Sequence, residues 1–155
     1  MRWGILANDF SSMNDSELTP HGDLLLRTLA MPADTNPSGD IFGGWIMSQM
    51  DIAGAILVRE LAKGRCVTVA VDAFKFHKPV KVGDVVCCYG KVERVGTTSM
   101  TLSLEVWVRS ATRAVEVEHP RFRVTEARFT YVAVDEEGKK RAVPESARAA
   151  LKADG

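Results

Sequence analysis

The sequence lacks a surplus of either charge. Twenty Lys and Arg residues balance twenty Asp and Glu residues, so the formal net charge at pH 7 is zero. Proteins that bind nucleic acid usually carry a basic face, which shows in the charge count. We therefore expect no nucleic acid partner, and there is no acidic tail.

Long apolar runs are also missing. No segment approaches the roughly 20 apolar residues that cross a bilayer, and residues 1–23 lack the apolar core of a signal peptide. There are only three cysteines, Cys66, Cys87 and Cys88, without metal-like spacing and inside strand-like segments. The sequence predicts no membrane partner and a cytoplasmic location.

Motifs for metal binding and serine hydrolysis are absent as well. The histidines, His21, His77 and His119, are scattered, which predicts no metal site. No G-x-S-x-G motif surrounds Ser38, which lies in a turn, and Ser48 has no evident base. The chemistry must therefore come from other side chains.

Periodicity and turn residues predict one long helix and an antiparallel sheet. We expect a loose lead-in over residues 1–23, a buried strand over 24–31, a loop over 32–40, a helix over 43–63 closed by a left-handed Gly64, strands over 67–76, 85–95, 100–108 and 122–134, a loop over 110–120, a short extension over 139–143, and a short helix within 144–153. Short connections between the strands favour antiparallel pairing in an α+β fold.

The predicted helix is unusually apolar. One stripe has spacings of four, three, four and four residues, and three further side chains widen it: Ile46, Met50, Ala53, Leu57 and Leu61, then Trp45, Ile52 and Ile56. We expect protein to surround this helix. Because one sheet around one helix leaves open edges, we expect at least a dimer.

A carboxylate stands just before the helix. Asp40 precedes Gly43 and Gly44, where N–H groups without helical partners favour negative charge. The glycines allow a substrate to approach the backbone closely. Asp40 either caps the helix or acts on a substrate there, and spacing alone leaves both open.

The residues around this feature resemble a known family. Met31-Pro32, Asn36, GDIFGGWIMSQMD over 39–51, VTVAVD over 67–72 and VGDVV over 82–86 are similar to the hotdog-fold acyl-CoA thioesterases, most of all to their YciA branch. The resemblance implies a single hotdog domain over residues 24–143, with residues 144–155 as a tail. It also implies hydrolysis of acyl-CoA to coenzyme A and a carboxylic acid without a cofactor, by a homodimer that assembles into a trimer of dimers.

The resemblance also implies roles for residues. Asp40 matches the catalytic carboxylate of the family, and Asn36 matches a polar residue of the same loop. Gly43 and Gly44 match the pair whose backbone lies beside the thioester carbonyl. Thr68 matches a position that faces the site across the dimer interface.

The segment 94–99 resembles the part of the fold that runs beside coenzyme A, which implies these contacts: Arg94, Gly96, Thr97, Thr98 and Ser99. Coenzyme A carries several phosphates, so basic residues should line its entrance. Lys78 is a candidate for this role, and so are Lys75, Lys91 and Arg94, which we expect near the same groove.

Two questions stay open at this level. Asp40 could activate water or attack the carbonyl itself. For Asp51, on the helix, we expect a structural hydrogen bond. The alternative to an enzyme is an acyl-CoA sensor of the same fold, which has no need for a carboxylate at the thioester.

Overall fold

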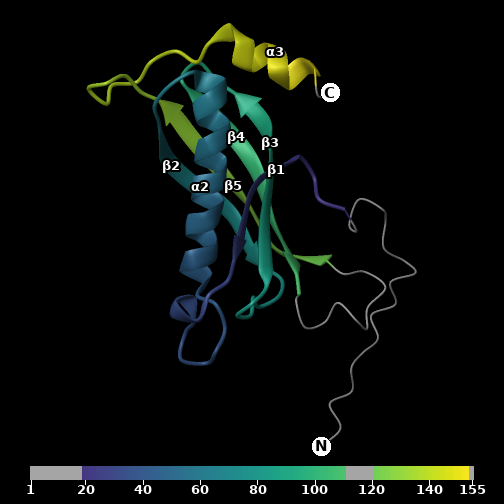
Figure 1. The fold of residues 1–155 in the computed structure, drawn as a ribbon. Coiled ribbons are helices and arrows are strands. Elements are labelled where there is room, and N and C mark those ends of the chain that lie inside the picture. Colours follow the sequence, from purple (N-terminus) through teal and green to yellow (C-terminus); the bar gives the residue numbers. More distant parts are fainter. Residues whose placement is uncertain (1–18, 111–120, 154–155) are drawn as a thin grey trace, which may run out of the picture.

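One curved sheet covers one long helix (Figure 1). The computed structural model describes residues 19–110 and 121–153, in which five antiparallel strands lie in the order β1-β3-β4-β5-β2. The elements are β1 (Asp23–Leu29), the 3₁₀ turn η2 (Pro32–Asp34), α2 (Gly43–Ala62), β2 (Cys66–Phe76), β3 (Val85–Val95), β4 (Ser99–Arg109), β5 (Arg121–Ala133) and α3 (Glu145–Ala153). This confirms the predicted α+β class and the antiparallel sheet.

The core lies between α2 and one face of the sheet. Every second residue of β4 is fully buried on that face: Met100, Leu102, Leu104, Val106 and Val108. These pack in one cluster with Ile46, Met50, Ala53 and Val58 of α2. Each large apolar side chain buried in this way contributes about 1.5–3 kcal/mol, so this layer fixes α2 on the sheet.

Part of the predicted apolar stripe of α2 faces outward. Ile52 and Ile56 are 47% and 40% exposed, so the expectation that protein surrounds the helix is wrong for a single chain. The edge strand β2 also exposes apolar side chains, among them Val69 at 54%. An edge strand with exposed apolar residues is a surface suited to pairing with another chain.

Other differences lie at element ends. The helix ends at Ala62, one residue earlier than predicted. Lys63, and not Gly64 as predicted, takes the left-handed conformation that closes the helix. In this conformation the N–H groups of Lys63 and Gly64 donate hydrogen bonds to carbonyl groups of the last helical turn. β1 is an edge strand and not a buried one, since β3 is its only neighbour among the described strands and Leu29 is exposed. His21, expected in a loose lead-in, is hydrogen-bonded to Glu105.

The C-terminal segment contributes to the fold. α3 packs on β3 and α2, and Ala147 belongs to the core cluster. Instead of a strand over residues 139–143, the structure has an isolated bridge between Val134 and Lys140.

The predicted loop over 110–120 lies almost entirely outside the described part of the chain, because residues 111–120, which include His119, are not described. None of the described helices is long and apolar enough to cross a membrane.

Gly54 allows α2 to approach β5 closely. A Cβ on Gly54 would lie 2.2 Å from the hydroxyl oxygen of Tyr131, whose ring is buried. Gly54→Ala should therefore destabilise the fold by about 1–3 kcal/mol, although alanine favours helix by about 1 kcal/mol. Thermal unfolding measures this effect. Adding Tyr131→Phe removes the clashing oxygen and should recover part of the loss, whereas a strictly additive double variant would contradict the contact.

Candidate active site

The loop before α2 is organised by one side chain. Asn36 Oδ1 accepts hydrogen bonds from the N–H groups of Ser38 at 2.9 Å and Asp40 at 3.1 Å. The backbone of Asn36 also bonds to Asp40 and Gly39. Side-chain bonds of this type fix tight turns. Asn36 therefore holds Asp40 in place, and in this structure its amide oxygen is engaged with the loop.

The first turn of α2 has no side-chain cap. The residue at the cap position is Phe42, and no acidic residue lies in the first turn. Within residues 19–110 and 121–153, the N–H groups of Gly43 and Gly44 have no acceptor. The capping alternative for Asp40 is therefore wrong, and the helix start remains available to an anionic group.

Asp40 lines a pocket beside this helix start. The pocket measures about 360 Å³ and is lined by Asn36, Asp40, Ile41, Ile46, Phe76, His77, Lys78, Pro79 and Val80. The backbone bond from Ile41 to Val80 joins the loop to the segment after β2, so the two walls form one unit. Lys81 Nζ donates to Asp40 Oδ1 in a partly exposed ion pair.

The two glycines differ in their surroundings. A Cβ on Gly43 would lie 2.9 Å from the ring of Phe76, whereas a Cβ on Gly44 would meet no atom within 4 Å. Phe76 therefore packs against the backbone at Gly43, whereas none of the described residues fills the space beside Gly44.

Thr68 lies far from Asp40 within one chain. It stands near the start of β2, about 26 Å along the strand from Phe76 at 3.3 Å per residue. Its hydroxyl donates to Asp51 Oδ1 at 2.6 Å, and Tyr131 donates to the same oxygen at 3.1 Å. Burial raises the pKa of Tyr131, and the neighbouring Asp51 carboxylate raises it further. The hydrogen bonding predicted for Asp51 is confirmed.

The predicted coenzyme A segment also lies at the other end of the molecule. It forms the β3–β4 connection beside α3, where Arg148 donates to the carbonyl of Gly96 at 2.6 Å. The Thr97 carbonyl accepts from Val143 and the Thr98 carbonyl accepts from Ala133. Among the residues predicted to contact coenzyme A, only Lys78 lines the pocket of Asp40 within a single described chain.

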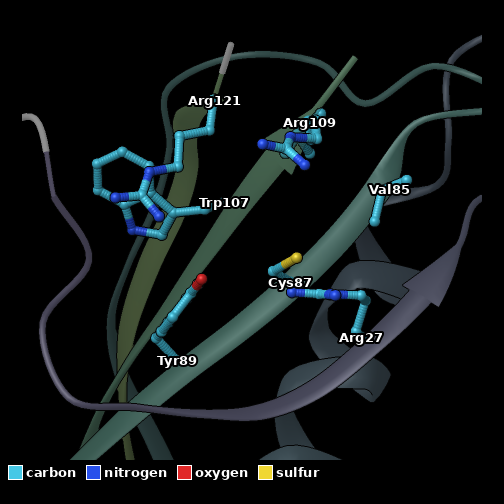
Figure 2. Close-up of a pocket in the computed structure, with 8 residues that line it drawn as sticks. Arg27, Val85, Cys87, Tyr89, Trp107, Arg109 and Arg121 are labelled. Carbon is cyan, nitrogen blue, oxygen red and sulfur yellow. The ribbon is translucent and has the colours of Figure 1, made fainter. Parts of the chain in front are cut away.

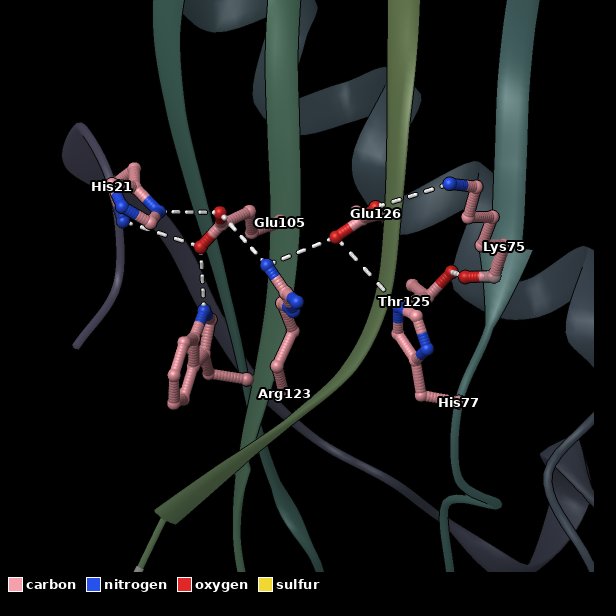
Figure 3. Close-up of polar contacts among 8 residues, drawn as sticks. His21, Lys75, His77, Glu105, Arg123, Thr125 and Glu126 are labelled. Atoms are coloured by element: carbon pink, nitrogen blue, oxygen red, sulfur yellow. Dashed lines mark hydrogen bonds and ion pairs between the residues drawn. The ribbon is translucent and has the colours of Figure 1, made fainter. Parts of the chain in front are cut away.

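A charged network crosses the outer face of the sheet and ends at this pocket (Figure 3). Glu105, which is buried, accepts from His21 Nδ1 and Trp107 Nε1, both at 2.8 Å. Arg123 lies 3.5 Å from Glu105 and 2.9 Å from Glu126. The network reaches the lining of the pocket at His77, whose Nε2 lies 3.6 Å from Glu126.

The buried carboxylate of this network makes stability depend on pH. Burial alone would raise the pKa of Glu105, but hydrogen bonds from Trp107 and His21 outweigh it and lower the pKa. The ionised form therefore stabilises the fold above the ordinary value of about 4.5, and this contribution is lost as pH falls through the lowered value. Glu105→Gln should lower Tm at pH 7 and give a shallower fall between about pH 5 and pH 3. Parallel Tm profiles of both proteins would contradict this.

Sequence reasoning missed three neighbours of Asp40. Phe76 ends β2, and His77 and Lys81 follow it in sequence. Tertiary contacts bring them to the loop, among them the hydrogen bond between Ile41 and Val80 and the ion pair of Lys81 with Asp40. Within the described ranges, no three His, Cys, Asp or Glu side chains form a group that could hold a metal ion.

Comparisons with known proteins identify the family of the chain. Residues 38–114 match the family model of the thioesterase superfamily. The acyl-CoA thioester hydrolase YciA of Escherichia coli K12 is 59% identical over 132 residues, which cover 85% of this chain and 98% of that protein.

Solved structures give the same result. HI0827, described as a hexameric broad specificity acyl-coenzyme A thioesterase, matches with a TM-score of 0.79 and 54% identity over 86% of this chain and 92% of that chain. The hexameric thioesterase y2039 of Yersinia pestis matches with a TM-score of 0.74 and 60% identity over 81% and 98%. The chain therefore belongs to the thioesterase superfamily, in the YciA group of hotdog-fold acyl-CoA thioester hydrolases.

Proposed function

We propose that this protein hydrolyses the thioester bond of acyl-CoA, giving free coenzyme A and a carboxylic acid. The observation that carries the proposal is the carboxylate of Asp40 in a pocket beside the open start of α2. A thioester reaction needs an activated nucleophile and donors for the oxygen that gains charge. Asp40 and the N–H groups of Gly43 and Gly44 meet both needs.

The reaction has two possible first steps at Asp40. As a base, Asp40 takes a proton from a water whose oxygen bonds to the thioester carbon. As a nucleophile, it bonds to that carbon itself, and water later opens the resulting anhydride. In both routes the carbon–sulfur bond breaks and the coenzyme A thiolate takes up a proton. The oxyanion formed on the way is stabilised by the start of α2.

Lys81 orients the carboxylate for either route. It contacts Oδ1, while Oδ2 has no hydrogen bond within the described residues. Oδ2 is therefore available to a water or to the carbonyl carbon. General base action contributes about 10²–10⁴-fold and one oxyanion donor about 10²–10³-fold, so these few groups suffice for a working esterase.

A second copy of the chain would complete the site. Antiparallel pairing of two β2 edges brings the start of one strand beside the end of the other. Thr68 and the segment 94–99, both at the far end of one chain, would then approach Asp40 of the partner. The exposed Val69 and Ile52 support this interface. The hexameric relatives support a trimer of such dimers.

The remaining features are part of the same proposal. One catalytic domain over residues 24–143 acts without a cofactor, since coenzyme A is itself part of the substrate, and Lys78 contributes to its binding. The free thiols of Cys87 and Cys88 suit a reducing compartment, which supports a cytoplasmic location.

Gly44→Ala tests the proposal by separating activity from stability. A methyl group there meets no neighbour within 4 Å but occupies the open space at the oxyanion site. The variant should be at least as stable as the wild type, since alanine favours helix, and should lose about tenfold or more in kcat/KM. Thiol release and thermal unfolding measure the two effects. Unchanged kcat/KM would contradict a substrate at Gly44.

A further inference from the structure

A second pocket lies on the outer face of the sheet, away from α2 (Figure 2). It measures about 320 Å³, within the range of small-molecule sites. Cys87 and Trp107 belong to its lining and alternate along their strands with Val86, Cys88 and Val106, which are buried in the core under α2. Val108 is a core residue that also borders the pocket. The pocket is therefore separate from that of Asp40, which shares none of its lining residues.

Three arginines surround this pocket without a described counter-charge. Arg27, Arg109 and Arg121 line it, and within residues 19–110 and 121–153 none of them has an ion pair. Arg109 lies directly opposite Arg121 in the pairing of β4 with β5. Like charges in directly opposed positions destabilise a sheet.

Neighbouring arginines on the same sheet behave differently. Arg123 pairs with Glu105 and Glu126, and Arg128 pairs with Glu93. Charge neutralisation is therefore the pattern over the rest of β5. Within the described residues Arg59, Arg65, Arg94 and Arg141 also have no ion pair, but three unpaired arginines line this one pocket, an arrangement that suits an anion.

The floor of the pocket is apolar and aromatic. Trp107 and Cys87 are 3% and 9% exposed, and in the strand register Cys87 lies between Arg27 and Trp107. Figure 2 shows the Tyr89 hydroxyl pointing toward the space between Trp107 and Cys87. A planar ring seated between the arginines would contact the small part of this floor that is still exposed, which an inorganic ion would not.

We propose that this pocket binds a nucleoside phosphate. Guanidinium groups form paired hydrogen bonds with phosphate oxygens, which suits the rim of Arg27, Arg109 and Arg121. Trp107 and Tyr89 contact the base. The site is independent of hydrolysis at Asp40, because it shares neither residues nor face with the pocket of that carboxylate.

Calorimetric titration of the intact wild-type assembly with ADP, pyrophosphate and adenosine tests the proposal. ADP should bind most tightly, pyrophosphate more weakly and adenosine not at all. Arg27→Gln/Arg109→Gln should weaken ADP binding at least tenfold, since each lost charged hydrogen bond is expected to count this much. Arg59→Gln, an exposed arginine on α2, is the matched control and should leave ADP binding unchanged.

Thermal unfolding gives a second readout. Without ligand, the double variant should be as stable as the wild type or more so, because the repulsion between Arg109 and Arg121 is relieved. ADP should raise the Tm of the wild type and not that of the variant. Failure of ADP and pyrophosphate to bind the wild type would overturn the proposal, as would equal affinity in the double variant. A variant that falls into smaller assemblies, with no ligand effect in the wild type, would identify the arginines as subunit contacts and overturn it too.

Discussion

Asp40→Asn is expected to lower kcat for acyl-CoA hydrolysis by about 10²–10⁴-fold. An amide can neither take a proton from water nor attack a carbonyl, yet it has nearly the same size and still accepts a hydrogen bond from Lys81. The loop is held by backbone and Asn36 contacts that the substitution leaves in place. Thiol release measures the rate, while thermal unfolding and sedimentation should give wild-type values.

Asp34→Asn provides the matched control. Asp34 lies in the same loop, and its carboxylate accepts from the N–H group of Met31 at 3.3 Å, which an asparagine oxygen can also do. This variant should keep kcat within about threefold of the wild type, since it removes a charge but no reacting group. Near wild-type turnover in Asp40→Asn, or equal losses in both variants, would contradict a reacting role for Asp40.

Val69→Asp is expected to abolish both the assembly and the activity. Val69 is the most exposed of the large apolar side chains on β2, and a charge there would be buried unpaired between two copies. If a partner supplies Thr68 and the segment 94–99 to Asp40, as we propose, the dissociated chain should lose at least about 10²-fold in kcat/KM. Analytical ultracentrifugation and thiol release measure the two effects together.

Val82→Asp is the control for this substitution. Val82 is also an exposed apolar residue, but it lies in the turn between β2 and β3 and not on the β2 edge. Its assembly state should match that of the wild type. A Val69→Asp protein that remains fully assembled would contradict pairing through the β2 edge.

Much of the fold follows from local patterns in the sequence. The strand over 85–95 was predicted with its observed limits, and the start of α2 at Gly43 was predicted as well. Both depend on periodicity and turn residues, which act within a few positions. The exposed faces of Ile52 and Ile56 were not predicted, because an apolar stripe does not distinguish burial in the chain from burial between chains.

The site was predictable only in part, for a related reason. The carboxylate and the two glycines are close in sequence, so their spacing indicated chemistry at a helix start. Lys81 and His77 approach Asp40 through tertiary contacts that leave no local pattern. The left-handed position at Lys63 was not predicted either, because capping hydrogen bonds to the last turn of α2 outweigh the preference for glycine there.

Steady-state thiol release by the purified wild-type assembly, with acyl-CoAs from acetyl to palmitoyl, tests the central claim most directly. We expect catalytic release of one thiol and one carboxylic acid per thioester consumed, over many turnovers and without added metal or cofactor. The profile over chain length would also measure the depth of the acyl pocket. Tight binding of acyl-CoA with no thiol released at any chain length would contradict the claim and identify the protein as an acyl-CoA sensor.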